Sequence, residues 1–186
     1  MLNYFQGLGI LNQEELYYIK EKIYLRRLKK GTSFIKEGEI STEVAWIKQG
    51  IIRSFYTTEK GDEFTYCILF KNTLVTALSS YISGEPTSEN MQAINDTILE
   101  VIKKEDLVNF MKNSTNFMKV EKMLIEQQYI ELEKRIFSFQ KEKATERYID
   151  LFKNNPEYIQ QIPLQYLASY LGISLRHLSR IRKSIL

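Results

Sequence analysis

Residues 164–183 read LQYLASYLGISLRHLSRIRK, and this spacing of apolar and small residues predicts two short helices that pack at a steep angle. Ala168 is small where the second helix must approach, and Gly172 permits the positive backbone angle of a tight turn. Ser174 is placed to cap the helix that follows. The run therefore predicts a helix-turn-helix with a shared apolar seam, formed by Leu167, Leu171, Ile173, Leu178 and Ile181.

Positive charge gathers in this part of the chain. Residues 141–186 hold eight Lys and Arg against four acids, and no acid follows Glu157 in the sequence. Cations without internal neutralisation suit a polyanionic partner such as DNA. The alternative is a solvated basic face near a helix C-terminus, where cations favour the helix dipole. With the seam turned inward, the residues expected to face base edges are Arg176, His177 and Arg180, and those expected to reach phosphates are Arg182 and Lys183.

The middle of the chain has the composition of helices. No glycine occurs between Lys104 and Gly172. Residues 113–115 offer caps for a long helix that ends near residue 139. One apolar seam recurs along it at spacings of four, three, four and three: Ile125, Tyr129, Leu132, Ile136 and Phe139. A second stripe begins on another face: Phe117, Val120, Met123 and Leu124.

The two stripes leave two arrangements open. Both could pack on the same chain, because about two to three heptads are too few to prove a coiled coil. The helix-turn-helix that follows favours a dimer, since dimers of this motif bind paired half-sites. We therefore assign one stripe to the same chain and the seam from Ile125 to Phe139 to dimerisation with a second copy.

Residues 25–101 have a different texture, in which short β-rich runs are separated by glycines. Strands and turns at such intervals predict a small barrel or jelly roll, and residues 58–63 are typical of a polar hairpin tip. One or two short helices should precede the barrel, and an amphipathic helix should cover residues 141–153. These boundaries predict an α+β chain with a β-barrel in residues 1–112, a long helix in 113–140 and the helix-turn-helix part in 141–186.

Several functional classes lack the residues that they need. Cys67, the single cysteine, cannot form an internal disulfide or supply an iron–sulfur cluster, and His177, the single histidine, leaves little for a metal site or a catalytic triad. We therefore expect no metal, no cofactor and no enzyme activity. No apolar run approaches the ~18–20 residues that span a bilayer, and the N-terminus lacks a secretory pattern. We expect a cytoplasmic protein without membrane contact.

The helix-turn-helix run resembles the DNA-binding helix pair of the Crp/Fnr family, on the pattern LAxxLGISxxxLSRIRK at residues 167–183. Upstream, KGxxFxxxGE at residues 30–39, VAWIKQG at residues 44–50 and GDE at residues 61–63 are spaced like that family's cyclic-nucleotide-binding-type barrel. The resemblance implies a barrel sensor, a long dimerisation helix and a winged helix-turn-helix, with residues 159–163 near a wing-side strand.

The resemblance also implies roles for single residues. In the family, the residues that correspond to Arg176 and Arg180 read bases. The residue that corresponds to Gln165 lies beside the phosphate backbone of the DNA. Leu175 stands where the family has a polar reader, so the operator sequence is not implied. RNA polymerase is an expected partner besides double-stranded DNA. The full set of expected DNA-contacting residues is Gln165, Ser174, Arg176, His177, Ser179, Arg180, Arg182 and Lys183.

The barrel departs from family members that bind cyclic AMP, which hold the phosphate with an arginine and begin that segment with a Gly-Glu pair. Here FKNTL at residues 70–74 replaces the pair, and Thr87-Ser88-Glu89 stands in place of the arginine segment. A cyclic phosphate would lose its charge-assisted hydrogen bonds, so we expect no response to cyclic AMP and leave the effector unidentified. Tyr66, Tyr81 and Met91 could line a small apolar pocket, although such residues are more often core.

These observations predict a sequence-specific DNA-binding transcription regulator that binds a two-fold operator as a homodimer, with the second helix of the pair in the major groove. Two alternatives remain. A cupin-like metal enzyme with an appended interaction domain finds little support, because residues 25–101 hold no histidine. A ligand-free barrel that serves as a dimerisation or partner scaffold would keep the DNA-binding part.

Overall fold

The computed structural model describes residues 1–185, apart from the side chains of Glu157 and Ile185. The chain divides into two compact units, and the long helix α5 (Thr115–Lys141) contributes its first part to one unit and the rest to the other. The first unit comprises Met1–Ser54 and Ile68–Glu126, and the second comprises Phe55–Cys67 and the chain from Gln127 onward.

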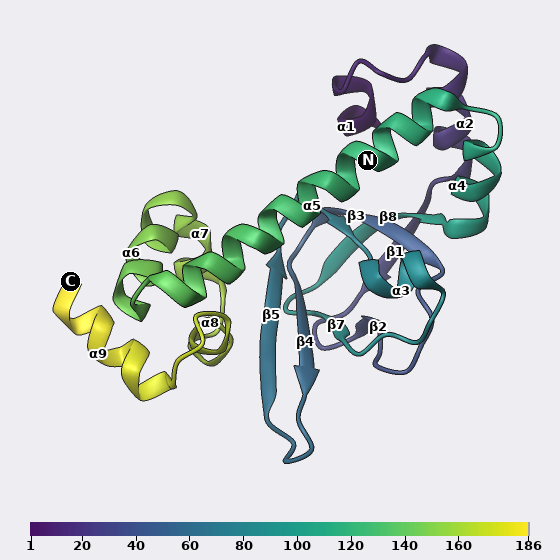
Figure 1. Cartoon of the computed structure of the whole chain (residues 1–186). Helices are drawn as coiled ribbons and strands as arrows, with labels where there is room; N and C mark the ends of the chain where they lie inside the picture. The colour runs from purple at the N-terminus through teal and green to yellow at the C-terminus, as the bar shows by residue number, and fades with distance from the viewer. Residues whose placement is uncertain (186) are drawn as a thin grey trace. The chain divides into compact units, whose positions relative to one another are not determined.

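Within residues 1–185, eight strands form two four-stranded sheets (Figure 1), which confirms the predicted jelly-roll type of barrel. One sheet has the order β1-β8-β3-β6, formed by Tyr24–Leu28, Thr97–Lys103, Glu43–Gln49 and Leu74–Val75. The other has the order β2-β7-β4-β5, formed by Ser33–Ile35, Asn90–Ala93, Ile52–Thr57 and Glu63–Leu69. The sheets share one apolar core, which contains Leu28, Ile35, Ala45, Ile47, Ile52, Val75, Ala77, Met91, Ala93, Leu99 and Val101.

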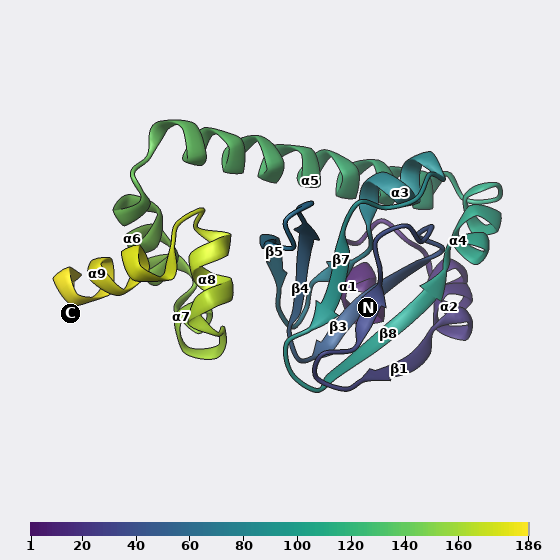
Figure 2. The ribbon, with the colours of Figure 1, turned by 90° about the horizontal axis from the view of Figure 1, so that it is seen from below.

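Helices cover the outer face of the β1-β8-β3-β6 sheet with a second apolar core. This core surrounds Trp46 of β3 and Ile102 of β8. α2 and α4 lie side by side (Figure 2), and the rings of Tyr18 and Phe110 stack there with 4.7 Å between their centroids. The contributing helices are α1 (Leu2–Gly7), α2 (Gln13–Lys22), α4 (Lys104–Met111) and the start of α5, whereas the short α3 (Leu78–Ser83) follows β6.

Side-chain caps and a tight turn mark the ends of several elements, and those at Ser114 and in residues 58–63 lie where the sequence predicts them. The Asn12 side chain accepts a hydrogen bond from the Glu15 amide at 2.9 Å, and the Glu15 carboxylate accepts one from the Asn12 amide at 2.8 Å. The Ser114 hydroxyl accepts a bond of 2.9 Å from the Phe117 amide and so caps α5. Gly61 has a φ of 86° at the tip of the β4–β5 hairpin. Local polar residues therefore fix where these elements begin and turn.

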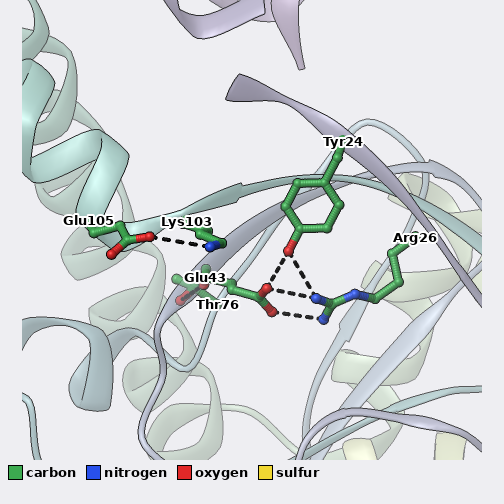
Figure 3. A network of polar contacts seen from close by, with 6 residues as sticks. All are labelled: Tyr24, Arg26, Glu43, Thr76, Lys103 and Glu105. Carbon is green, nitrogen blue, oxygen red and sulfur yellow. Dashed lines mark hydrogen bonds and ion pairs between the residues drawn. The ribbon is translucent and has the colours of Figure 1, made fainter. Parts of the chain in front are cut away.

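A polar network links β1 to β3 across the intervening strand β8 (Figure 3), on the face of the first sheet that also carries the barrel core. Arg26 on β1 donates two hydrogen bonds, of 2.8 and 2.6 Å, to the Glu43 carboxylate on β3, and the Tyr24 hydroxyl donates to the same carboxylate. Burial alone would raise the pKa of Glu43, but the hydrogen bonds from Arg26 and Tyr24 outweigh it and lower that pKa. The Thr76 hydroxyl donates to the Glu43 carbonyl at 3.0 Å, so three segments of the sheet are tied at one point.

After α5 the described chain is helical. The amphipathic helix expected over residues 141–153 begins only at Ala144, because Lys141 completes α5. The Glu146 carboxylate accepts a hydrogen bond of 2.7 Å from the Lys143 amide and marks the new start. The helices are α6 (Ala144–Asn154), α7 (Pro156–Gln161), α8 (Leu164–Tyr170) and α9 (Leu175–Ile185).

The expectation of a wing-side strand near residues 159–163 is wrong. α7 extends to Gln161, and residues 141–185 contain no strand. Pro156 stands at the first position of α7, where its fixed φ favours a helix and its missing amide hydrogen is not needed. Pro163 could not donate in a strand ladder either. The two prolines thus bound a short helix.

Candidate nucleic-acid interface

The turn between α8 and α9 is closed by the backbone bonds of a Schellman motif. The Ile173 amide donates to the Ala168 carbonyl at 3.0 Å, and the Gly172 amide donates to the Ser169 carbonyl at 3.0 Å. Gly172 has a φ of 70°, the positive angle that the sequence predicts for it. The Ser174 hydroxyl caps α9 by accepting a bond of 3.2 Å from the amide of its third residue. The predicted turn and cap are therefore confirmed.

The apolar seam that holds α8 against α9 is also confirmed. Ala168, at 2% exposed, provides the close approach. Four of the five predicted seam residues are buried: Leu167 and Leu178 are 0% exposed, Leu171 2% and Ile181 4%. The fifth, Ile173 in the turn, is half-buried. Because Leu178 and Ile181 point inward, the opposite face of α9 is turned toward solvent.

Six of the eight residues expected to contact DNA lie at the surface. Arg176, Arg180 and Lys183 recur at spacings of four and three along α9 and so share one face. The Ser179 hydroxyl donates to the Leu175 carbonyl at 3.0 Å, so it also serves the helix itself. The exposed members are Gln165, Ser174, Arg176, Ser179, Arg180 and Lys183.

The other two expected contact residues, His177 and Arg182, are half-buried. The Nε atom of Arg182 is inaccessible to solvent and has no hydrogen-bond partner. A guanidinium that lies against the helix pair presents less of itself to a phosphate than the exposed Lys183 does. The geometry therefore favours Lys183 over Arg182 as a contact to a polyanion.

The two stripes of α5 differ in burial. Phe117 and Val120, at 4% and 0% exposed, lie in the core of the first unit. On the stripe assigned to dimerisation, Tyr129, Leu132 and Ile136 are 66%, 42% and 46% exposed. Ile125 is half-buried, and Phe139 is 39% exposed with its ring directed at the helix-turn-helix.

Two arginines that sequence reasoning left out reach the turn. Arg135 Nη2 donates to the Tyr170 carbonyl at 2.9 Å, and Arg147 Nη2 donates to the Leu171 carbonyl at 3.0 Å. The Phe139 ring faces both guanidinium carbons, with its centroid 4.8 Å from that of Arg135 and 4.6 Å from that of Arg147. Their partners are 35 and 24 residues away in sequence, so no local pattern could have indicated them.

The first residues of β5 also contact α8. The Ser169 hydroxyl accepts a hydrogen bond of 2.8 Å from the Thr65 amide and donates one of 3.3 Å to the Glu63 carbonyl. β5 is an edge strand of its sheet, so its outer backbone groups are open to such contacts. The hairpin is thus tied to the first helix of the pair by one hydroxyl.

Residues 87–89, which stand where members of the resembled family that bind cyclic AMP have an arginine, carry the carboxylate of Glu89. The Ser54 hydroxyl of β4 donates to the Glu89 carboxylate. Burial raises the pKa of Glu89 despite this hydrogen bond. Thr87 is 7% exposed and its backbone bonds to Gly38 and Glu39 at 2.8 Å each. The segment therefore offers a bound phosphate no positive charge.

The three residues considered for an apolar pocket differ in exposure. Met91 belongs to the barrel core at 4% exposed, and Tyr81 is 8% exposed. Burial, with a smaller effect of the Glu121 charge, raises the pKa of Tyr81 to about 12. Tyr66 is 44% exposed. Met91 and Tyr81 are thus core residues, as the general preference of such side chains suggests.

Comparisons with known proteins agree with this architecture. Residues 25–114 match the family model of the cyclic nucleotide-binding domain. No curated protein sequence matches the chain significantly. FixK2 from Bradyrhizobium japonicum has 16% identity and a TM-score of 0.75, over 88% of this chain and 84% of that one. A protein from Eubacterium rectale assigned to the Crp/Fnr family has 20% identity and a TM-score of 0.77, over 98% and 87%.

The catabolite activator protein of Thermus thermophilus has 20% identity and a TM-score of 0.59, over 94% of this chain and 84% of that one. The Eubacterium rectale protein is described as a transcriptional regulator, and the Thermus thermophilus protein as an activator. Among the helices of residues 1–185, none is long and apolar enough to cross a membrane. Residues 25–114 are thus similar to cyclic nucleotide-binding domains, and the chain has the fold of the Crp/Fnr-type regulators.

Proposed function

We propose that this protein is a sequence-specific DNA-binding transcription regulator that acts as a homodimer. The observation that carries the proposal is the exposed basic face of α9, which holds Arg176, Arg180 and Lys183 behind a turn closed by Gly172. A helix of this kind fits the major groove with its first residues toward the bases. Arg176 and Arg180 are then the base-reading residues, because an arginine can donate two hydrogen bonds to a guanine.

The remaining members of the predicted set have supporting roles. Lys183 neutralises phosphates, and Gln165 lies beside the backbone at the other helix of the pair. Ser174 and Ser179 contact phosphates in addition to stabilising α9, and the half-buried His177 and Arg182 contribute less. RNA polymerase is the expected further partner of a regulator in the cytoplasm.

Dimerisation is proposed through α5. The exposed side chains of Tyr129, Leu132 and Ile136 follow one another at heptad-like spacing, and burial of such a stripe against its copy removes apolar surface from water. Two identical half-sites about one DNA turn apart then bind one dimer. The operator should therefore have two-fold symmetry.

The barrel is proposed to sense a ligand other than cyclic AMP or to serve as a scaffold without a ligand. The carboxylate of Glu89 in the segment of residues 87–89 supports the exclusion of cyclic AMP. A ligand that binds only the folded protein must raise its unfolding midpoint. Titration of nucleotides and small metabolites with this readout separates the two cases, because the scaffold shows no shift.

The test of DNA binding begins with selection of bound sequences from random double-stranded DNA by the full chain. We expect a two-fold consensus. Arg180→Ala should weaken binding to that operator by about 1–3 kcal/mol, or roughly 5–150-fold, and relax the preference at one base position. Lys153→Ala removes an exposed cation from α6 and is the matched control. A selection without any consensus, or equal affinities for the two variants, would overturn the proposal.

A further inference from the structure

The end of α8 has a complete set of partners for its carbonyl groups. A helix leaves its last four carbonyls without donors from its own chain segment. The Schellman bonds from Ile173 and Gly172 satisfy the carbonyls of Ala168 and Ser169. The next two carbonyls, of Tyr170 and Leu171, receive Arg135 and Arg147 at 2.9 and 3.0 Å. Side chains from α5 and α6 therefore finish the turn of the helix-turn-helix.

Arg135 reaches this position through ring contacts as well as through its hydrogen bond. Its guanidinium carbon lies 4.2 Å from the centroid of the Tyr170 ring and 4.8 Å from that of the Phe139 ring. A planar cation between two rings is held in one orientation, which a lysine cannot reproduce. Arg135 is thus positioned by α5 and fixes the end of α8.

Phe139 fits the turn from the same side. A Cβ atom at Gly172 would lie 2.6 Å from Cε1 of Phe139, so the ring occupies the space that only a glycine leaves. Arg147 covers the ring, with its guanidinium carbon 4.6 Å from the centroid, and also donates to the Glu142 carbonyl at 2.6 Å. The break between α5 and α6 is therefore tied to the turn as well.

These contacts give the positive charges of Arg135 and Arg147 a structural role. Both guanidinium groups lie at the carbonyl end of α8, where cations are favoured by the helix dipole. Arg135 and Arg147 are half-buried, and the hydrogen bonds from Arg135 Nη2 and from both Nη atoms of Arg147 go to carbonyl groups rather than outward. They are therefore poor candidates for phosphate contacts, although Arg147 counts toward the basic excess of this region.

The helix that grips the turn is also the helix that carries the exposed stripe of Tyr129, Leu132 and Ile136. In a dimer formed through that stripe, the contacts of Arg135 would fix the orientation of α8 and α9 relative to α5. We propose that Arg135, together with Phe139 and Arg147, is a positioning residue that fixes the recognition helix on the dimerisation helix and so sets the half-site spacing that the dimer accepts. This inference rests on the proposed function.

Arg135→Ala and Lys134→Ala provide a matched pair for the test. Both remove one positive charge from adjacent positions of α5, but Lys134 is 66% exposed and forms an ion pair of 2.9 Å with the exposed Glu131. The affinity of each full-length variant is measured for one half-site and for two half-sites at a series of spacings. We expect Arg135→Ala to keep half-site binding, to lose about tenfold or more for the best two-site DNA, and to show a flattened spacing preference.

Lys134→Ala should retain the sharp spacing preference of the unaltered protein, and Arg135→Lys should recover only part of it. Equal losses on one and two half-sites would assign Arg135 to DNA contact or to folding and overturn the positioning role. An unchanged spacing preference in Arg135→Ala would also overturn it.

Hydrogen exchange separates this inference from the proposed function. Exchange of the Gly172 and Ile173 amides should accelerate in Arg135→Ala and stay unchanged in Lys134→Ala, with or without DNA. Unaltered protein that selects no two-fold operator would overturn the proposed function and the spacing role together. Equal exchange rates in the two variants would show that Arg135 does not hold the turn, whatever the protein binds.

Discussion

The two halves of α5 are held in different ways. In the first half, Phe117 and Val120 are 4% and 0% exposed within an apolar core. In the second half, Tyr129 is 66% exposed, and the helix is held at its end by Arg135 through a carbonyl bond and ring contacts. The first half of α5 is held by burial of its apolar side chains. The second half exposes an apolar stripe and is held by the hydrogen bond and ring contacts of Arg135. An exposed stripe on an anchored helix is suited to a second copy of the chain.

The largest expected effect is on the buried half. Phe117→Ala should lower the free energy of unfolding by about 3–5 kcal/mol, because it removes a buried ring and leaves a cavity. Tyr129→Ala is the matched aromatic truncation on the exposed half and should change it by about 0.5 kcal/mol or less in the monomer. Chemical denaturation at low protein concentration measures both. Similar losses in the two variants would contradict the difference between the halves.

The contacts of Arg135 and Phe139 with the turn, which anchor the second half of α5, are tested at Gly172. Both Gly172 and Gly61 have a positive φ, 70° and 86°, so alanine costs about 1–2 kcal/mol of conformational energy at either site. An added Cβ meets nothing within 4 Å at Gly61 but lies 2.6 Å from Phe139 Cε1 at Gly172. Gly172→Ala should therefore lower stability by about 1–3 kcal/mol more than Gly61→Ala.

Thermal unfolding of both glycine variants gives this difference. Phe139→Leu combined with Gly172→Ala should recover part of the loss, because the smaller side chain withdraws from the clash. If the two single variants lose equal stability, the ring does not press on the turn.

The anchor also marks where sequence patterns stop being informative. The turn at Gly172, the cap at Ser174 and the cap at Ser114 could be predicted, because each depends on residues within one helical turn. The bond from Thr65 to Ser169 joins residues 104 apart in sequence. Such a contact depends on the whole arrangement of the unit and leaves no periodic trace in the chain.

Two other features had ambiguous patterns. The wing-side strand near residues 159–163 is implied by the resemblance alone, and the sequence PEYIQQI at residues 156–162 is too short for its period to separate a strand from a helix. Along α5, both stripes have helical spacing, and spacing alone does not tell which one is buried. Phe117 and Leu132 could therefore be placed on different faces, but the assignment of the seam with Leu132 to dimerisation rests on the helix-turn-helix that follows and not on the spacing.

A smaller effect concerns the exposed stripe itself. Leu132→Asp should weaken self-association by roughly 10–100-fold, since burial of a leucine contributes about 1.5–3 kcal/mol. Leu25→Asp places the same charge at a leucine on β1 that is 58% exposed, and it should leave self-association unchanged. Sedimentation velocity over a range of concentrations measures both. If the Leu132→Asp and Leu25→Asp variants dimerise with equal affinity, the interface does not include this stripe.

The smallest expected effect is a pH dependence of stability. It should be seen for the contacts of the Glu43 carboxylate in the first unit but not for those of Arg135 and Arg147 in the second. The pKa of Glu43 is lowered from its ordinary value of 4.5, so its bonds to Arg26 and Tyr24 stabilise the fold fully above that value and are lost as the pH falls through the lower, folded-state pKa. Because the pair is partly exposed, Glu43→Gln should cost only about 0.5–1 kcal/mol at neutral pH, and this difference should shrink toward about pH 3. Arg135 and Arg147 bind carbonyl groups, which do not titrate in this range. Denaturation of both proteins across pH checks this, with Glu105→Gln, at a carboxylate 70% exposed, as the control. A difference that stays constant with pH would mean that Glu43 acts through packing rather than through its charge.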